Sequence, residues 1–248
     1  MINQNGIDTE SKINIIYEDE DFLILEKPSG LVVHPNKYQK DNTLVDWILK
    51  NYPEVKEVGE ITRPGIVHRL DKDVSGLMII AKNNATYQHL ISQFKNRKIK
   101  KEYLALISGK IFPAEGLINF SIARNKKGKL VTVDSQDTYV STKVKNIKSA
   151  TTEYKIVKEF QDFTFVKLKL LTGRTHQIRL HLKAMGCPIV GDKKYSTKQF
   201  NNLKTKQEIG RIFLHACCLG FYDLHNKWRE FKSQLPSGLK VFMDNLRV

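Results

Sequence analysis

The sequence predicts an α+β protein built on a mixed, largely antiparallel central sheet that is flanked by helices. Predicted strands outnumber predicted helices, and most neighbouring strands look antiparallel. The 248 residues contain no low-complexity linker and no repeat of about 20–50 residues. We therefore expect one domain over residues 12–248, preceded by a disordered polar tail over residues 1–11.

The first half of the chain alternates between apolar runs and helical patterns. Residues 13–35 predict a hairpin of two apolar strands around an acidic turn, closed by Pro28 and Gly30. Helices are expected at 43–53 and, capped by an Asn, at 83–98. Further strands are expected at residues 65–70, 76–82 and 101–109. The middle one of these three contains an apolar run, which indicates burial on both of its faces.

The second half continues with strand patterns and one well-marked helix. The strand patterns lie at residues 116–124, 151–160 and 163–173. Residues 174–186 predict a helix that Thr175 caps and Gly186 ends. Its apolar side carries Ile178, Leu182 and Met185. Its opposite, basic side carries His176, Arg179 and Lys183.

A large excess of positive charge narrows the range of partners. The chain has 41 Lys and Arg against 26 Asp and Glu, a net charge of +15. A polyanion explains this excess, and nucleic acid is the commonest polyanion. The alternative is a Lys-rich surface without such a partner. Two basic clusters, "KNRKIKK" at 95–101 and "RNKKGK" at 124–129, favour a groove that follows phosphates.

Cysteine usage and hydropathy indicate the compartment. The three Cys include the adjacent pair Cys217 and Cys218, which makes an awkward disulfide, so a reducing compartment is expected. No signal peptide is visible at the N-terminus. No apolar run approaches the roughly 20 residues of a membrane span. We expect a cytoplasmic protein with no membrane partner.

Several sequence motifs are missing, which argues against the kinds of catalysis that depend on them. The chain has no HExxH and no CxxC, and His176 and His181 are five residues apart, so no metal site is expected. It also has no GxGxxG, no Walker loop and no GxSxG, so we expect neither a nucleotide cofactor nor a serine nucleophile of that type. Carboxylate, Tyr and Arg chemistry remains.

Asp71 is the carboxylate that stands out, because it follows a predicted strand end and has Arg69 two residues before it. A lone Asp in such a place is usually a turn or cap residue. A buried Arg on the basic helix side needs a carboxylate partner, and Asp71 is the candidate for Arg179. Arg174 and the first-turn N–H groups form an anion site at the helix start. The alternative is a polar helix face that simply meets water.

Three stretches together resemble the RluA-type pseudouridine synthases in order and spacing. They are "HRLDKDVSGL" (68–77), "KKEYLAL" (100–106) and "LTGRTHQIRLHL" (171–182), with "PIVGDKKY" (188–195) following. The resemblance covers roughly residues 13–222. It implies the pseudouridine synthase catalytic fold, as a single catalytic domain, and an isomerase that acts on uridine in RNA. The N1–C1′ bond breaks, the base turns, and C5 is joined to C1′, without a metal or other cofactor.

The resemblance also implies roles for three residues. Asp71 is the essential carboxylate, which attacks C1′, attacks C6 of the base, or stabilises a cleaved intermediate. Tyr103 lies against the uracil ring and helps remove the C5 proton. Arg179 forms an ion pair with Asp71. These residue types suit the task, because a carboxylate held ionised by Arg is a ready nucleophile at neutral pH.

RNA contacts are expected around these residues. A base inside a stem cannot be reached, so the target uridine must be flipped out or already unpaired. We expect Arg69 to fill the gap that the base leaves or to grip its phosphate. The other RNA-binding residues that we expect are His68, Lys98, Lys100, Arg124, Arg174 and His176.

The chain departs from the family pattern in two ways. Val74 stands where relatives usually carry Thr, which puts one local turn hydrogen bond in doubt. Only about a dozen residues precede the first predicted strand, too few for the S4 module of many relatives. We therefore expect the catalytic domain to capture RNA unaided, as a monomer.

The substrate remains open at the level of sequence. The stretch "RPGIVHRLDKDVSG" favours large-subunit ribosomal RNA over tRNA as the substrate. A non-catalytic RNA-binding or ribosome-assembly protein on the same fold is the alternative from another class. A glycosidase or phosphodiesterase using Asp71 and Asp73 leaves the Tyr and Arg motifs unexplained. The sequence does not give the target nucleotide, because RNA shape and loop bases determine specificity.

Overall fold

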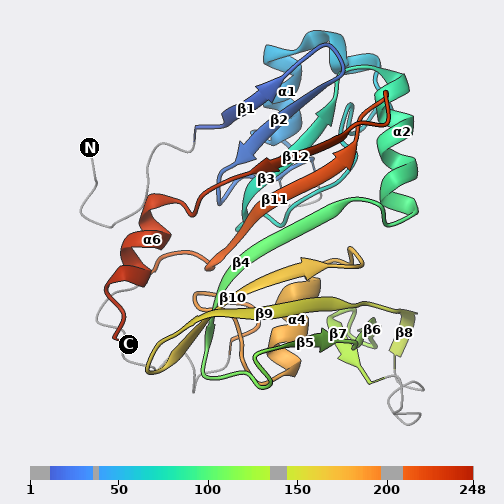
Figure 1. The fold of residues 1–248 in the computed structure, drawn as a ribbon. Coiled ribbons are helices and arrows are strands. Elements are labelled where there is room, and N and C mark those ends of the chain that lie inside the picture. Colours follow the sequence, from blue (N-terminus) through green and yellow to red (C-terminus); the bar gives the residue numbers. More distant parts are fainter. Residues whose placement is uncertain (1–11, 36–38, 135–143, 197–208, 248) are drawn as a thin grey trace. The chain divides into compact units, whose positions relative to one another are not determined.

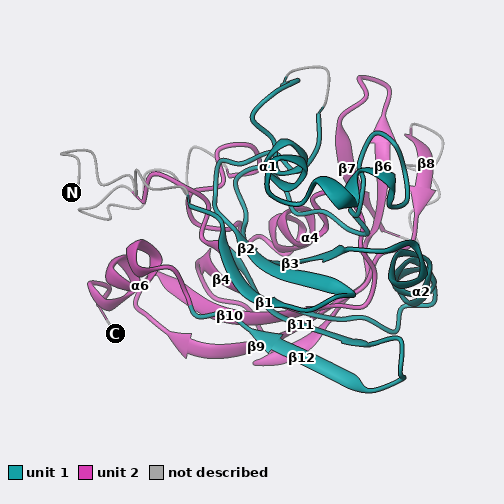
Figure 2. Ribbon diagram, turned by 90° about the horizontal axis from the view of Figure 1, so that it is seen from above, with its two compact units in different colours: residues 1–101, 215–234 teal, residues 102–214, 235–248 magenta. Residues whose placement is uncertain are grey.

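The computed structural model describes residues 12–35, 39–134, 144–196 and 209–247. The tail expected at residues 1–11 lies outside this range. The chain divides into two compact units, which Figure 2 shows in different colours. Unit 1 comprises residues 1–101 and 215–234, and unit 2 comprises residues 102–214 and 235–248. The expectation of a single catalytic domain over 12–248 stays a prediction.

Unit 1 is built on a mixed sheet (Figure 1). Its strands, in sheet order, are β1 (Asn14–Glu18), β2 (Phe22–Lys27), β3 (Ser75–Ala81) and β11 (Leu214–Tyr222), with β12 (Trp228–Lys232) paired to β11. The pairs β1–β2, β2–β3 and β11–β12 are antiparallel, whereas β3 and β11 run parallel. All seven residues of β3 are buried, as its apolar run predicts.

The helices of unit 1 begin at the caps that their sequences supply. Helix α1 (Leu44–Asn51) starts with a capping box between Thr43 and Asp46, and a 3₁₀ helix (Pro53–Glu57) follows it. Helix α2 (Asn84–Lys95) is capped by Asn83, whose side chain accepts a hydrogen bond from the Thr86 N–H. Helix α2 contacts β3. Both predicted helices of this half are confirmed.

Unit 2 contains two antiparallel sheets. The larger has the strand order β4 (Lys100–Ser108), β10 (Phe163–Leu170), β9 (Thr152–Glu159) and β5 (Glu115–Ile118). The smaller has the order β7 (Leu130–Val133), β6 (Ser121–Asn125) and β8 (Val144–Lys148). Helix α4 (Gln177–Ala184) contacts β9 and β7, and α6 (Ser237–Asp244) follows β12 in the chain. The predicted α+β class with a mixed, largely antiparallel sheet is confirmed.

Cross-strand ion pairs explain the alternating pattern of β10. Lys167 pairs with Glu102 on β4 at 2.8 Å, and Lys169 pairs with Glu153 on β9 at 3.6 Å. The intervening Leu168 is fully buried. One side of the strand is therefore charged and the other apolar, as period-two alternation predicts.

Three local predictions are wrong. Residues 65–70 form no strand, because Ile66 makes only an isolated bridge to Ile80. The expected strand at 116–124 is two strands, β5 and β6, which pair in different sheets. Helix α4 begins after His176, which has a left-handed backbone (φ 56°) and makes no side-chain cap, so Thr175 is not the N-cap. The sequence patterns also missed β7, β8, β11, β12 and α6.

Candidate active site and nucleic-acid contacts

Asp71 lies at the start of a tight turn in unit 1. The Val74 N–H donates to the Asp71 carbonyl at 3.2 Å, and β3 begins at the next residue, Ser75. The side chains of Lys72 and Asp73 are exposed, whereas Asp71 is partly buried. Asp71 is therefore less exposed than the two charged residues that follow it, and its turn leads into a fully buried strand.

A second loop of unit 1, residues 27–31, holds the backbone of this turn. Lys27 is 1% exposed, and its ammonium donates to the carbonyls of Pro28 (2.7 Å), Leu31 (2.8 Å) and Lys72 (3.0 Å). The Gly30 N–H also donates to the Lys72 carbonyl at 2.9 Å, and the Ser29 hydroxyl donates to the Asp73 carbonyl at 2.6 Å. A buried ammonium needs such acceptors for its three N–H bonds. The backbone of the two residues after Asp71 is therefore held by Lys27, Ser29 and Gly30.

Arg69 and His68 precede Asp71 and differ in exposure. Arg69 is exposed, and its Nη1 lies 2.8 Å from Nε2 of His34. His68 stacks on Phe94 with ring centroids 5.0 Å apart, and its Nε2 accepts from the Ile79 N–H at 3.1 Å. Burial, and then the charge of Lys101, lower the pKa of His68 to about 3. His68 is therefore neutral near pH 7, and its role in RNA binding stays a prediction.

In unit 2, Arg179 has a buried carboxylate partner on the loop after α4. Its Nε donates to Oδ2 of Asp192 and its Nη2 donates to Oδ1, both at 2.8 Å. Arg179 is 6% exposed and Asp192 is 2% exposed. Oδ1 of Asp192 also accepts from the backbone N–H groups of Lys194 (3.0 Å) and Tyr195 (3.1 Å). The expectation that a buried Arg on this helix needs a carboxylate is confirmed, with Asp192 as one partner.

Tyr195 links the start of α4 to this ion pair. The Cζ of Arg179 lies 5.0 Å from the centre of the Tyr195 ring, within the range of a cation–π contact. Nδ1 of His176 is hydrogen-bonded to the Tyr195 hydroxyl at 2.7 Å. His176 is thus engaged inside unit 2 through one ring nitrogen. Arg179 is held by two hydrogen bonds to the Asp192 carboxylate and by contact with the Tyr195 ring.

Tyr103 lies on β4 of unit 2, in register with Leu168 of β10. It is 8% exposed, so its ring is covered and only a small part of its surface reaches solvent. Asp71 belongs to unit 1, whereas Tyr103 and Arg179 belong to unit 2. The pairing of Asp71 with Arg179 and the placement of Tyr103 beside it stay predictions.

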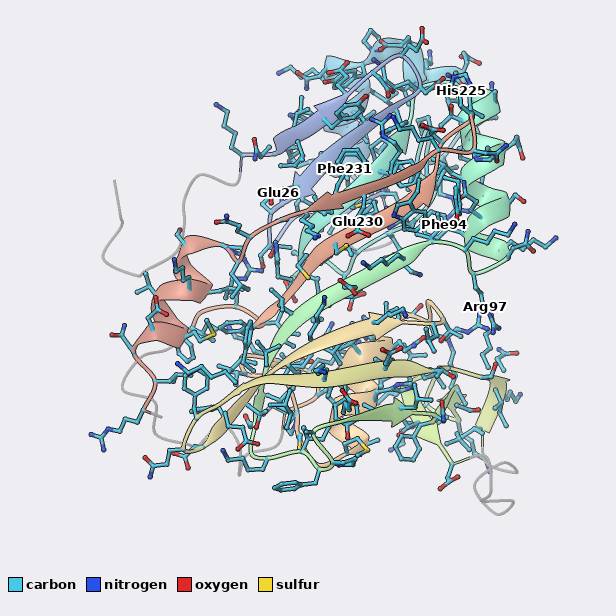
Figure 3. All side chains as sticks on the ribbon, in the orientation of Figure 1. Glu26, Phe94, Arg97, His225, Glu230 and Phe231 are labelled. Carbon is cyan, nitrogen blue, oxygen red and sulfur yellow. The ribbon has the colours of Figure 1, made fainter. Side chains whose placement is uncertain are left out.

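The first basic cluster is only partly available to phosphates. Lys98 is exposed, as is Arg97 on the loop after α2 (Figure 3). Lys100 instead pairs with Glu230 at 3.0 Å, and the ammonium of Lys101 lies 5.5 Å from the Phe94 ring centre. Burial lowers the pKa of Lys101. The exposed positive charge of this cluster therefore lies at its N-terminal half.

The second cluster surrounds the turn between β6 and β7. Arg124 is exposed, and its Nη1 donates to the Gly128 carbonyl at 2.9 Å across this turn. The exposed lysines of the same turn are Lys126, Lys127 and Lys129. Arg174, just before α4, donates through Nε to the Ser149 carbonyl at 3.1 Å and stays partly exposed. These cations can meet a polyanion, as the sequence analysis expects.

Lys27, Asp192 and Tyr195 are the residues near these groups that the sequence analysis did not single out. The sequence offers a clue to Lys27, because this residue ends the apolar run "FLILEK". Its charge therefore falls in a segment that is expected to be buried. Asp192 and Tyr195 belong to the quoted stretch "PIVGDKKY", which received no role. Among the described residues, no group of three or more His, Cys, Asp and Glu could hold a metal ion. None of the described helices is both long and apolar enough to cross a bilayer.

Comparison with known proteins agrees with the motifs at these positions. Residues 21–184, more than half of the chain, match the family model described as RNA pseudouridylate synthase. The chain is 38% identical over 236 residues to "Uncharacterized RNA pseudouridine synthase YlyB" of Bacillus subtilis, covering 95% of this chain and 73% of that protein. It is 39% identical over 216 residues to "Ribosomal large subunit pseudouridine synthase D" of Blochmanniella floridana, covering 84% of this chain and 64% of that protein.

A solved structure shows the same fold. "Human RNA Pseudouridylate Synthase Domain Containing 1" matches with a TM-score of 0.72 and 27% identity, over 91% of this chain and 84% of that chain. Sequence and structure thus agree over most of the chain. The chain belongs to the RNA pseudouridylate synthase family and is an isomerase that acts on RNA.

Proposed function

We propose that this enzyme converts specific uridines of large-subunit ribosomal RNA to pseudouridine, with Asp71 as its essential carboxylate. One curated relative that shares 39% of aligned residues carries the name of a large-subunit ribosomal enzyme. The proposed role of Asp71 rests on the hydrogen bonds that fix the backbone of its turn. Three donors, the Lys27 ammonium, the Ser29 hydroxyl and the Gly30 N–H, bind the backbone of the two residues that follow Asp71.

A fixed carboxylate suits this isomerisation. The N1–C1′ bond of uridine breaks, the uracil turns, and a C5–C1′ bond forms while C5 loses a proton and N1 gains one. Asp71 acts on the reacting atoms by attack at C1′, by attack at C6, or by stabilising the cleaved state. Each route needs the carboxylate oxygen at a defined place, and rigid placement lowers the entropic part of the barrier.

Arg179 and Tyr103 complete the proposed chemistry. A guanidinium has five N–H donors and Asp192 accepts from two of them, so the Asp192 pair does not exhaust the capacity of Arg179. Arg179, already oriented by Asp192 and Tyr195, pairs with Asp71. Tyr103 offers an aromatic face to the uracil and a hydroxyl that assists removal of the C5 proton.

Exposed cations of both units capture the RNA. In unit 1 these are Arg97 and Lys98, and in unit 2 they are Arg124 and the lysines of the β6–β7 turn, together with the partly exposed Arg174. Arg69, exposed and two residues before Asp71, fills the gap left by the flipped base or binds its phosphate. The enzyme works as a cytoplasmic monomer in this proposal.

A pseudouridine map of total RNA from cells with and without the gene tests the substrate. We expect one or more sites in large-subunit ribosomal RNA to be lost with the gene and restored by a plasmid copy. Loss of sites in tRNA alone would replace the proposed substrate class. An unchanged map would contradict the proposal altogether.

A further inference from the structure

A chain of four polar side chains runs through unit 1 and ends beside the Asp71 turn. The hydroxyl of Ser75 lies 2.9 Å from Nδ1 of His215, and Nε2 of His215 lies 2.8 Å from the hydroxyl of Ser233. Ser233 in turn donates to the carboxylate of Glu26. Glu26 lies on β2, Ser75 on β3 and His215 on β11, while Ser233 follows β12. Glu26, which Figure 3 labels, is the end of this chain opposite Ser75.

The donors and acceptors fix the direction of this chain. The Glu26 carboxylate only accepts, and it lies much closer to the Ser233 hydroxyl than the Gln234 carbonyl at 3.3 Å does, so it takes the single proton of that hydroxyl. The Ser233 oxygen then accepts from Nε2–H of His215, which leaves Nδ1 of the neutral ring as the acceptor for the Ser75 hydroxyl. The negative charge of Glu26 therefore selects one tautomer of His215 and one orientation of the Ser75 hydroxyl.

Because Ser75 and His215 are buried, breaking a hydrogen bond of this chain is costly in free energy. Ser75 is 3% exposed and His215 is 2% exposed, so water cannot replace a lost partner of either side chain. The parallel pairing of β3 with β11 is short, with His215 opposite Ser75 and Ala216 opposite Gly76. Gly76 has φ +126°, and a Cβ there would collide with the backbone of Ala216. The two strands thus meet closely where the side chains also bond.

The position of Ser75 connects the chain to Asp71. Ser75 is the first residue after the turn that Val74 closes onto the Asp71 carbonyl. Lys27, the neighbour of Glu26 in sequence, holds the same turn at the Lys72 carbonyl. Lys27 and Glu26 are adjacent in β2. Lys27 bonds directly to the Lys72 carbonyl within the turn, and Glu26 reaches Ser75, the residue after the turn, through Ser233 and His215.

We propose that His215, oriented by Glu26 through Ser233, is a positioning residue that fixes Ser75 and thereby the carboxylate of Asp71. The inference rests on the proposed role of Asp71. His215 does not touch the RNA in this scheme, and no proton needs to travel along the chain. Its effect is on the rate of the chemical step, because a carboxylate that moves by an ångström loses its alignment with the reacting atom.

The matched variants Ser75→Thr and Ser75→Val test this inference. Their side chains have nearly the same shape, but only Thr carries a hydroxyl. The substrate is total RNA from cells lacking the gene, labelled with C5-tritiated uridine, and the readout is tritium release in a single turnover. We expect Ser75→Val to react roughly tenfold to a hundredfold more slowly than Ser75→Thr. The enzyme concentration at half-maximal rate should agree between the two. Equal rates for the two variants would overturn the inference.

A second pair of variants tests the inference even if the substitutions at the buried Ser75 prevent folding. Ser233 is only partly buried, so Ser233→Thr and Ser233→Ala should both fold. We expect Ser233→Ala to be the slower by several-fold, with circular dichroism unchanged; identical rates would overturn the inference. Asp71→Asn separates this outcome from a failure of the proposed function. Wild-type release by Asp71→Asn would refute the role of Asp71, whereas an inactive Asp71→Asn with an unaffected Ser75→Val would refute only the positioning chain.

Discussion

Arg179 and Asp192 form a buried ion pair in which two N–H groups of one guanidinium meet both oxygens of one carboxylate, each at 2.8 Å. Two backbone N–H groups, of Lys194 and Tyr195, hold the same carboxylate. Burying both charges is costly, and the full set of hydrogen bonds offsets that cost. The pair therefore fixes an Arg at the place where the family pattern expects a functional one.

Asp192→Asn should destabilise the protein strongly. The substitution removes the charge of Asp192 from the buried guanidinium of Arg179 and puts an amide NH₂ where a carboxylate oxygen accepts, which costs about 3 kcal/mol or more in free energy of unfolding. Urea unfolding followed by circular dichroism measures this. Glu115→Gln is the control, because it breaks an exposed pair with Lys155 that contributes less than about 1 kcal/mol. Similar losses for the two variants would contradict a special role for the buried pair.

Lys27→Met should slow the reaction as well as lower stability. It keeps most of the unbranched side chain but removes the ammonium that donates to three carbonyls, and a buried polar group without a partner costs about 1–3 kcal/mol. Because one of these carbonyls belongs to Lys72, the Asp71 turn should loosen. Lys110→Met, which removes an exposed ammonium bound to the Phe160 carbonyl, is the matched control. If both variants release tritium at the wild-type single-turnover rate, the hydrogen bond from Lys27 to the Asp71 turn does not contribute to catalysis.

His68 should make stability depend on pH between about 6.5 and 3. Its folded pKa of about 3 lies below the ordinary value of 6.5, so the unfolded chain binds a proton in this window that the folded chain does not. Stability should therefore fall as the pH drops, by roughly 1–2 kcal/mol from pH 7 to pH 5. His68→Gln keeps an acceptor for the Ile79 N–H but cannot titrate. Urea unfolding at pH 7, 6 and 5 should show a smaller loss for this variant; parallel losses would refute the assignment.

Lys98 and Lys100 should contribute unequally to RNA binding. Lys98 is exposed, whereas the Lys100 ammonium is paired with Glu230. Each phosphate contact on a single strand adds about −0.7 to the slope of log affinity against log salt. We expect Lys98→Gln to reduce this slope by about that amount and Lys100→Gln to reduce it less. Filter binding of ribosomal RNA at several salt concentrations measures both, and a larger effect for Lys100→Gln would contradict the structure.

The parts of the fold that sequence predicts are those that local pattern determines. The apolar run of β3, the Asn83 cap of α2 and the alternation of β10 are each legible within a few neighbouring residues. The segment 65–70 misled because its residues are apolar enough for a strand. Its backbone instead makes turn bonds, such as that from the Ile66 N–H to the Arg63 carbonyl.

The supporting contacts of the candidate site could not be predicted, because they join distant segments. The need of Arg179 for a carboxylate follows from burial alone, but the choice of Asp192 depends on how the loop after α4 folds back. The register of His215 with Ser75 spans 140 residues and follows from strand pairing that no local pattern encodes. Sequence motifs predict the reacting groups, and the three-dimensional structure shows which residues contact Arg179 and the turn that follows Asp71.

Tritium release by Asp71→Asn tests the proposed chemistry most directly. The variant should bind ribosomal RNA as tightly as the wild type, since the side chain keeps its size, and should release no tritium from C5-labelled uridine above the rate without enzyme. Wild-type protein under the same conditions should release it in a single turnover. Release by Asp71→Asn at a rate close to that of the wild type would contradict an essential carboxylate at this position.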